Sequence, residues 1–300
     1  DSVERGTYDG EEVLIRFMTA DTREARARAE AGMRLHQYVY DRFPEHVVPI
    51  IAGQVMSGRR ETMVVFPPAA YTLGQAMHPA EGEQDVVLLL RLLLDAADGL
   101  VRLHERRVYH RGLNPGCIFV YEEEGEGPRA KLWDFGVGKM TGSSKFMSMS
   151  MSTPRGARGD GEWPKGLAVY RAPESFKPPR EPTHKVLVGS DVYSLGVMLG
   201  EVLSGRVPLP QCETYADVIM YHDEWEAMEP QSPHDGGGNE PGAFDEAAAM
   251  AAAHRLGVDE DPARDLARDM KRLAVACTKH DPAKRASMLT LRAGMARCYE

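Results

Sequence analysis

Residues 109–136, YHRGLNPGCIFVYEEEGEGPRAKLWDFG, carry the pattern from which the fold can be predicted. Two apolar runs within them, 117–121 and 130–133, are short enough for strands, and the acidic run 122–127 between them is turn material. A polar loop precedes the first run, and a second polar loop follows the second run. We therefore expect two short strands flanked by two loops whose polar residues are candidates for chemistry.

The composition limits the size of the fold and the kind of partner. The chain has 300 residues, of which 43% are hydrophobic, so it is long enough for two lobes with a large core. Its formal charge of −9 argues against nucleic acid and anionic membranes, which need clustered Lys and Arg. The most apolar run, 86–105, is interrupted by Arg91, Asp95 and Asp98, so we expect a buried helix and no membrane span.

The chain divides into a strand-rich part, 1–66, and a helical part, 71–300. Residues 67–70, which include two prolines, form the predicted hinge. Two polar segments, 143–166 and 229–242, are predicted to be a surface loop and a flexible insertion. We see no signal peptide at the start and expect the chain to begin inside a longer protein. Further strands are expected at 11–17, 47–55 and 61–66, and helices at 21–40, 71–77, 86–105, 191–204, 244–255, 263–280 and 286–299.

The chain has four cysteines, Cys117, Cys212, Cys277 and Cys298. No two of them form a C-x-x-C pair, so a zinc ribbon or a redox pair is not expected. Two interpretations remain open. Either all four are reduced, mostly buried thiols, or one or two disulfides join Cys212, Cys277 and Cys298 and leave Cys117 unpaired.

Six short motifs, in this order along the chain, resemble those of the protein kinases. The resemblance implies an α+β, bilobal, protein kinase-like fold, with a small β-rich N-lobe that is reduced and lacks a Gly-rich loop, and a large helical C-lobe. It also implies an activation segment at 134–174. The motifs are Val13-Leu14-Ile15-Arg16, His110-Arg111-Gly112, Asp134-Phe135-Gly136, Ala172-Pro173-Glu174, Asp191–Gly196 and Asp281–Arg285.

The same resemblance shows which catalytic positions are altered. Gly112 stands where the family has its catalytic Asp, and a glycine has no side chain to accept a proton. Asn114 replaces the Lys of that loop, and Cys117 replaces the Asn that binds a metal. Arg16 replaces the strand Lys, and the two side chains are not interchangeable. Asp134 is the one magnesium ligand that remains, with a structural role as the alternative.

The phosphate grip of the family is also expected to be weak. Residues 1–12 contain Gly6 and Gly10 among several acidic side chains and do not form G-x-G-x-x-G. We expect a shortened stub of the loop, with a first strand missing from the chain as the alternative. Arg16 is expected to pair with Glu30 or Glu24, or to form a structural ion pair across the small lobe.

The motifs that are intact support the fold. The resemblance implies that Glu174 and Arg285 form a buried ion pair, and that Asp191 binds the backbone N–H groups of the loop around His110. Because fold support is kept and transfer chemistry is altered, we expect a pseudokinase that is not an enzyme and binds ATP and magnesium weakly or not at all. The alternative is a nucleotide-binding switch or an atypical phosphotransferase that uses Asp134.

A narrower resemblance is to the rhoptry-kinase-like secreted pseudokinases of apicomplexan parasites. It rests on the altered His110-Arg111-Gly112 motif, the long activation segment and the cysteines of the C-lobe. The weak Gly loop is most similar to the bradyzoite pseudokinases of that group, which are associated with the cyst wall. This resemblance implies secretion into a parasite organelle, vacuole or cyst wall, and it favours the disulfides. It also implies a scaffold that binds other proteins through surface loops.

Overall fold

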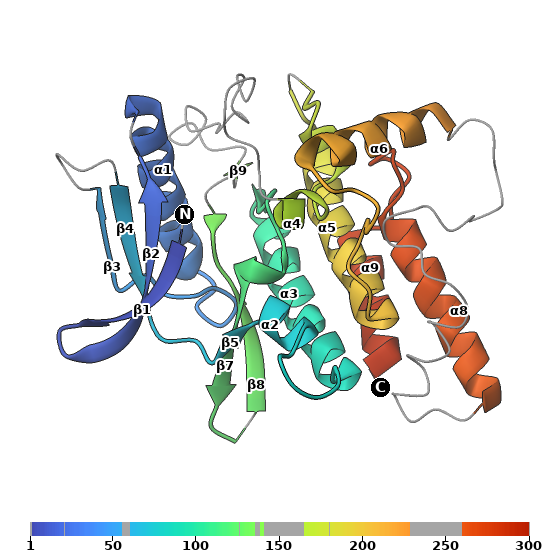
Figure 1. The fold of residues 1–300 in the computed structure, drawn as a ribbon, viewed down its shortest axis with the longest axis horizontal. Helices are drawn as coiled ribbons and strands as arrows, with labels where there is room; N and C mark the ends of the chain where they lie inside the picture. The colour runs from blue at the N-terminus through green and yellow to red at the C-terminus, as the bar shows by residue number, and fades with distance from the viewer. Residues whose placement is uncertain are drawn as a thin grey trace.

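The fold is seen in a computed structural model, which places a sheet-rich lobe beside a larger helical lobe (Figure 1). We call residues up to 66 the small lobe and residues from 71 onwards the large lobe. The predicted α+β, two-lobed architecture is confirmed. The structure describes residues 2–20, 22–55, 61–125, 127–135, 139–140, 165–179, 181–228 and 260–299.

The small lobe is an antiparallel sheet with the strand order β1-β2-β4-β3. One helix, α1 (Arg23–Tyr40), accompanies the sheet, and the hydroxyl of Thr22 caps it by accepting from the N–H of Ala25. The buried face of α1 includes Leu35, His36 and Val39. The strands are β1 (Ser2–Tyr8), β2 (Glu11–Thr19), β3 (Ala52–Val55) and β4 (Glu61–Phe66).

The alternative that the first strand is missing is wrong, because β1 is a full strand paired with β2, and the loop between the two strands is as short as expected. The pair joins Tyr8 to Glu11, so only Asp9 and Gly10 form the turn. Their φ angles are 52° and 88°, as a type I′ turn requires. The Asp-Gly dipeptide between two alternating runs was the signal for this hairpin in the sequence.

The first part of the large lobe contains a second sheet. Its strand order is β5-β7-β8, and the pair β6-β9 lies apart from it. The predicted helix at 71–77 is shorter than expected, because Tyr71 and Thr72 pair with β7 before the helix starts. These elements are β5 (Tyr71–Thr72), α2 (Leu73–Met77), α3 (Val86–Glu105), β6 (Val108–Tyr109), η1 (Pro115–Cys117), β7 (Ile118–Glu123), β8 (Gly127–Leu132) and β9 (Lys139–Met140).

Helix α5 (His184–Ser204) is the centre of the large lobe, and most of its side chains are buried. It begins earlier than the predicted residue 191, since the hydroxyl of Thr183 accepts from the N–H of Val186. Among the described helices, α5 is long and apolar enough to cross a bilayer, but 89% of its apolar window is buried inside the protein, as in a core helix. The other elements are α4 (Lys165–Ala168), η4 (Pro173–Ser175), α6 (Tyr215–Met228), α8 (Glu260–Cys277) and α9 (Met288–Tyr299).

Three predicted features lie outside the described residues, at 143–166 for the most part, at 229–242 and at 244–255. Helix α6 was not expected from the sequence. The predicted strand at 47–55 is shorter, because Val47 makes only an isolated bridge to Leu132 before β3 begins.

Candidate functional site

Asp191 on α5 holds the polar loop that follows β6. Its carboxylate accepts the backbone N–H groups of His110 at 2.9 Å and Arg111 at 2.7 Å, and the Nε2–H of His104 at 2.9 Å. Burial favours the neutral acid, but the hydrogen bond and charge of His104 outweigh it and hold the pKa of Asp191 below its ordinary value. The structure thus places Asp191 and the loop in the contact expected from the sequence.

The three altered residues of this loop bind one another. The amide nitrogen of Asn114 donates to the carbonyl of Gly112 at 3.0 Å and to the sulfur of Cys117 at 2.9 Å. The amide oxygen of Asn114 accepts from the N–H of Gly116, which caps the short helix η1. Burial raises the pKa of Cys117 well above its ordinary value, so the side chain stays a neutral thiol. The three residues therefore stabilise the conformation of the loop through contacts with one another.

Arg16 on β2 meets Asp134, the residue that follows β8 and Trp133. Its Nη1 lies 2.5 Å from Oδ1 of Asp134, and its guanidinium lies over the Trp133 ring, 5.1 Å from the centroid. The side chains of Arg16 and Asp134 are 15% and 24% exposed, so solvent screens the pair less than a surface pair. This contact joins the sheet of the small lobe to the second polar loop.

The structure does not bring Arg16 to Glu30. Glu30 lies 3.7 Å from Arg34 one turn further along α1, and its side chain is 45% exposed. The buried face of α1 is formed by other residues, including Leu35 and His36, so Glu30 points away from the sheet. Glu24 lies in the exposed first turn of the same helix. The expected partner of Arg16 in α1 is therefore wrong.

An aromatic row runs from α1 to the polar loop through Phe135. The centroid of Phe135 lies 5.2 Å from that of His36 and 5.0 Å from that of His110. His110 donates from Nε2 to the carbonyl of Trp133 at 2.8 Å, and His36 donates from Nε2 to the carbonyl of Val48 at 2.6 Å. Sequence reasoning did not single out His36, although its place on the buried face of an amphipathic helix was a signal.

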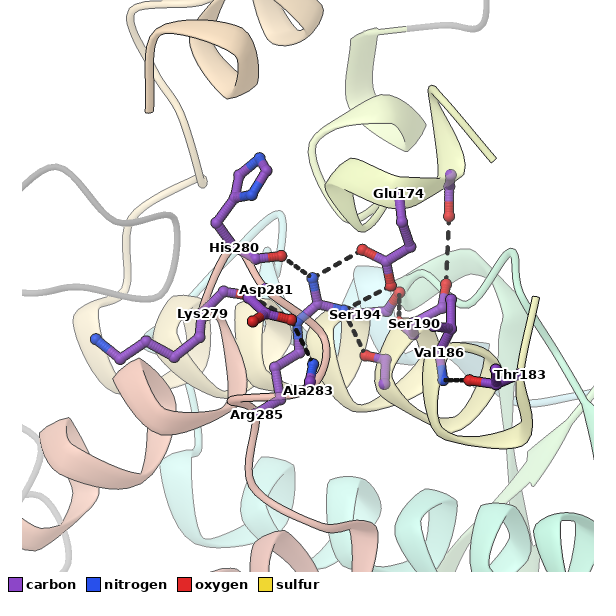
Figure 2. A network of polar contacts seen from close by, with 12 residues as sticks. Glu174, Thr183, Val186, Ser190, Ser194, Lys279, His280, Asp281, Ala283 and Arg285 are labelled. Carbon is purple, nitrogen blue, oxygen red and sulfur yellow. Dashed lines mark hydrogen bonds and ion pairs between the residues drawn. The ribbon is translucent and has the colours of Figure 1, made fainter. Parts of the chain in front are cut away.

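Glu174 and Arg285 form the polar centre of the large lobe (Figure 2). The guanidinium of Arg285 donates two hydrogen bonds to the carboxylate of Glu174, at 2.6 and 2.8 Å. It also donates to the backbone carbonyls of Gly189, Lys279 and His280. The side chain of Arg285 is fully buried, so this network ties η4, α5 and the segment before α9 together.

Glu201 is another buried carboxylate, which the sequence analysis did not single out. Its two oxygens accept from the hydroxyl of Tyr170 at 2.6 Å and from Nε2 of His78 at 2.8 Å. Burial raises the pKa of Glu201 above its ordinary value. The contact fixes the segment before η4 to α5. Tyr170 and Glu174 are therefore both held against α5, Tyr170 by Glu201 and Glu174 through Arg285. The sequence held a signal for it, because Glu201 stands in an apolar run that predicts a buried helix, and a buried acid needs polar partners.

The predicted disulfides do not form at Cys212 or Cys277. In the described part of the chain, Cys117, Cys212 and Cys277 are all buried thiols. Cys277 packs against Gly196 of α5, and burial raises the pKa of its thiol to about 12. The side chain of Cys298 is outside the described residues. The first interpretation from the sequence, buried thiols, therefore holds for these three, and secretion stays a prediction.

Comparison with known proteins places this geometry in a family. The family model of the protein kinase domain matches residues 88–294. The serine/threonine-protein kinase pkn2 of Myxococcus xanthus is 32% identical over 119 residues, which are 40% of this chain and 12% of the relative. The serine/threonine-protein kinase drp72 of Corynebacterium efficiens is 28% identical over 228 residues, which are 75% of this chain and 36% of the relative. The receptor-like serine/threonine-protein kinase ALE2 of Arabidopsis thaliana is 31% identical over 209 residues, which are 67% of this chain and 24% of the relative.

These comparisons also correct the sequence analysis. The chain spans between 12% and 36% of the length of these three relatives. The prediction that the domain is not an enzyme is contradicted, because the matched relatives are named as serine/threonine-protein kinases. The finer resemblance to secreted pseudokinases of apicomplexan parasites stays a prediction. Since the family model covers more than half of the chain and its motifs hold the contacts described above, the chain belongs to the protein kinase family.

Proposed function

We propose that the domain binds a nucleoside triphosphate between its lobes and transfers the terminal phosphate slowly to a serine or threonine of another protein. The observation that carries the proposal is the contact between Arg16 and Asp134. It sets a guanidinium and a carboxylate side by side, partly exposed, where the two lobes meet. The names of the relatives support the same type of reaction.

The residues present fit a nucleotide better than they fit two magnesium ions. The guanidinium of Arg16 can bind phosphate oxygens, and its planar fork suits them. Asp134 offers one carboxylate, which already pairs with Arg16. Cys117 stands at the second metal position as a buried thiol that donates to Gly112, and magnesium prefers oxygen. When bound, the nucleotide supplies the phosphoryl group, and the protein supplies position and charge.

The missing base accounts for a slow reaction. A general base contributes roughly 10²- to 10⁴-fold, and protein kinases turn over at about 1 to 100 per second. Phosphoryl transfer depends mostly on position and electrostatics, so the loss of the base lowers the rate without removing the other contributions. Gly112 does not belong to the described glycines that have a positive φ, so its backbone conformation is one that residues with a side chain can also adopt.

The direct test restores the base with Gly112→Asp. We expect the variant to transfer labelled phosphate from ATP to a mixed protein substrate roughly 10²- to 10⁴-fold faster than the natural chain. Arg16→Ala should abolish transfer in both backgrounds, while Arg292→Ala, at an exposed Arg–Asp pair of the large lobe, should leave it unchanged. If neither the natural chain nor Gly112→Asp binds ATP or transfers phosphate, the proposal is wrong.

Binding of other proteins through surface loops is proposed as an additional role. Its support is the frame of buried polar contacts around Asp191 and Glu174, which gives the surface loops a rigid base. The candidate loops, 143–166 and 229–242, lie almost entirely outside the described residues. A pull-down from cell extract with both loops replaced by short linkers tests the role. An unchanged set of partners would contradict it.

A further inference from the structure

We infer that the guanidinium of Arg16 takes the place of a divalent cation between Asp134 and a nucleotide's phosphates, so that binding needs no magnesium. The inference rests on the proposed function, because it concerns the same site. The inference goes beyond the proposed function because it names the Arg16 guanidinium as the cation that balances the charges of Asp134 and the phosphates. The residues of this site do not suit a pair of magnesium ions, because one metal position is the thiol of Cys117.

The position of Arg16 is fixed on two sides. Nη1 lies 2.5 Å from Oδ1 of Asp134, and the guanidinium plane is held over Trp133. Trp133 is itself anchored, because its Nε1–H donates to the carbonyl of Gly116 at 2.7 Å. A guanidinium carries five N–H donors in a rigid plane, so it can contact a carboxylate and a phosphate together. Arg16 can therefore bridge the two anionic groups.

A metal ion at Asp134 would have to displace this guanidinium. Both side chains are mostly buried, so the attraction between them is screened less than at the surface. The ion would gain a single carboxylate from this loop, since the other metal position is the buried thiol of Cys117. Magnesium also gives up its water shell reluctantly. The exchange therefore disfavours the metal and favours Arg16.

Asp134 and Arg16 have opposite effects on a phosphate in this arrangement. Arg16 attracts it, and Asp134 both orients Arg16 and repels the phosphate. If a metal were the bridge, Asp134 would instead be indispensable for binding. The variant Asp134→Asn keeps the size of the side chain and removes its charge, so it separates the two cases.

The experiment measures binding of ATP and of inorganic triphosphate by titration calorimetry, in EDTA and in magnesium. We expect the same affinity in both buffers and equal or tighter binding in Asp134→Asn. Arg16→Ala should weaken binding about 10- to 100-fold in both buffers, the loss typical of a hydrogen bond to a charged group. The matched control is Arg292→Ala, whose Nε lies 2.6 Å from Asp98 at the exposed surface of the large lobe, and its binding should not change.

The outcomes separate this inference from the proposed function. Binding that appears only with magnesium and is lost in Asp134→Asn would overturn the inference, while the proposed function would stand. No binding in either buffer would overturn both. Circular dichroism of each variant shows whether it is folded. If Arg16→Ala is unfolded, Arg16→Gln, which keeps the length and loses the charge, replaces it with the same expectation.

Discussion

The carboxylate of Glu174 receives both terminal nitrogens of Arg285, at 2.6 and 2.8 Å, although 111 positions separate the two residues in the chain. Their side chains are 12% and 0% exposed. Glu174→Ala removes the carboxylate and leaves a buried cation with only carbonyl partners. We expect the free energy of unfolding to fall by about 3 to 5 kcal/mol, the cost of breaking a buried pair. Urea unfolding followed by circular dichroism measures it.

The matched control for that prediction is an exposed pair of the same chemistry. Arg292 and Asp98 are 45% and 36% exposed and join α9 to α3. Arg292→Ala should cost at most about 1 kcal/mol, because solvent screens an exposed pair and the free side chains regain entropy. Equal losses for the two variants would show that burial does not set the strength of the Glu174 contact.

The protein should lose stability as the pH falls from 6.5 toward 4, because of His36. Burial lowers the pKa of His36 from 6.5 to about 4, against the opposing hydrogen bond to Val48 and the charge of Asp134. Between these values the unfolded chain binds a proton that the folded protein does not, so stability is complete above pH 6.5 and declines below it. The shift corresponds to on the order of 3 kcal/mol. Unfolding in urea at a series of pH values measures the loss.

The contribution of His36 is isolated by His36→Gln, which removes the titrating ring and keeps a donor for the Val48 carbonyl. The variant should be less stable at pH 7, because contact with Phe135 is lost, but its stability should depend less on pH. A smaller slope should remain, since burial also lowers the pKa of His222 to about 3. An unchanged slope in the variant would assign the acid sensitivity to other groups.

The parts of the fold that were predictable are those with a local or ordered signal. The ordered motifs predicted the two lobes and brought Glu174 to Arg285. The partner of Arg16 was not predictable, because β2 and the loop after β8 meet only in the folded protein, while Glu30 and Glu24 in the nearby helix were the candidates that the sequence offered. The hairpin at Asp9 has a local signal, an Asp-Gly dipeptide between two alternating runs, although residues 1–12 stand where the kinases have a phosphate loop.

A reducing agent should not change the melting temperature. Cys117 and Cys277 are buried thiols, and burial raises the pKa of each, so thiolate attack on a disulfide or an alkylating reagent is suppressed. Folded protein should therefore react slowly with a thiol reagent at these positions, and denatured protein should show all four thiols. A melting temperature that falls on reduction, or fewer than four thiols after denaturation, would indicate that the protein contains a disulfide.

Gly196 of α5 lies where α8 crosses closely, and we expect Gly196→Ala to destabilise the protein. A Cβ at this position would stand 2.5 Å from the Cβ of Cys277, a distance that real Cβ atoms do not reach. Alanine in a helix gains about 1 kcal/mol of propensity over glycine. Overpacking costs about 1 to 3 kcal/mol or more, and here the clash is with an atom held close to the backbone.

The control for Gly196 is Gly74→Ala in α2, where the nearest atom to a new Cβ is the Cβ of Pro115 at 3.4 Å, an ordinary contact. Gly74→Ala should leave the melting temperature equal or raise it, because only the propensity and the entropy of the unfolded chain change. Gly196→Ala should lower it. If both variants were equally stable, α8 would be able to move away from α5, and the close packing of Gly196 against Cys277 would not limit the stability of the large lobe.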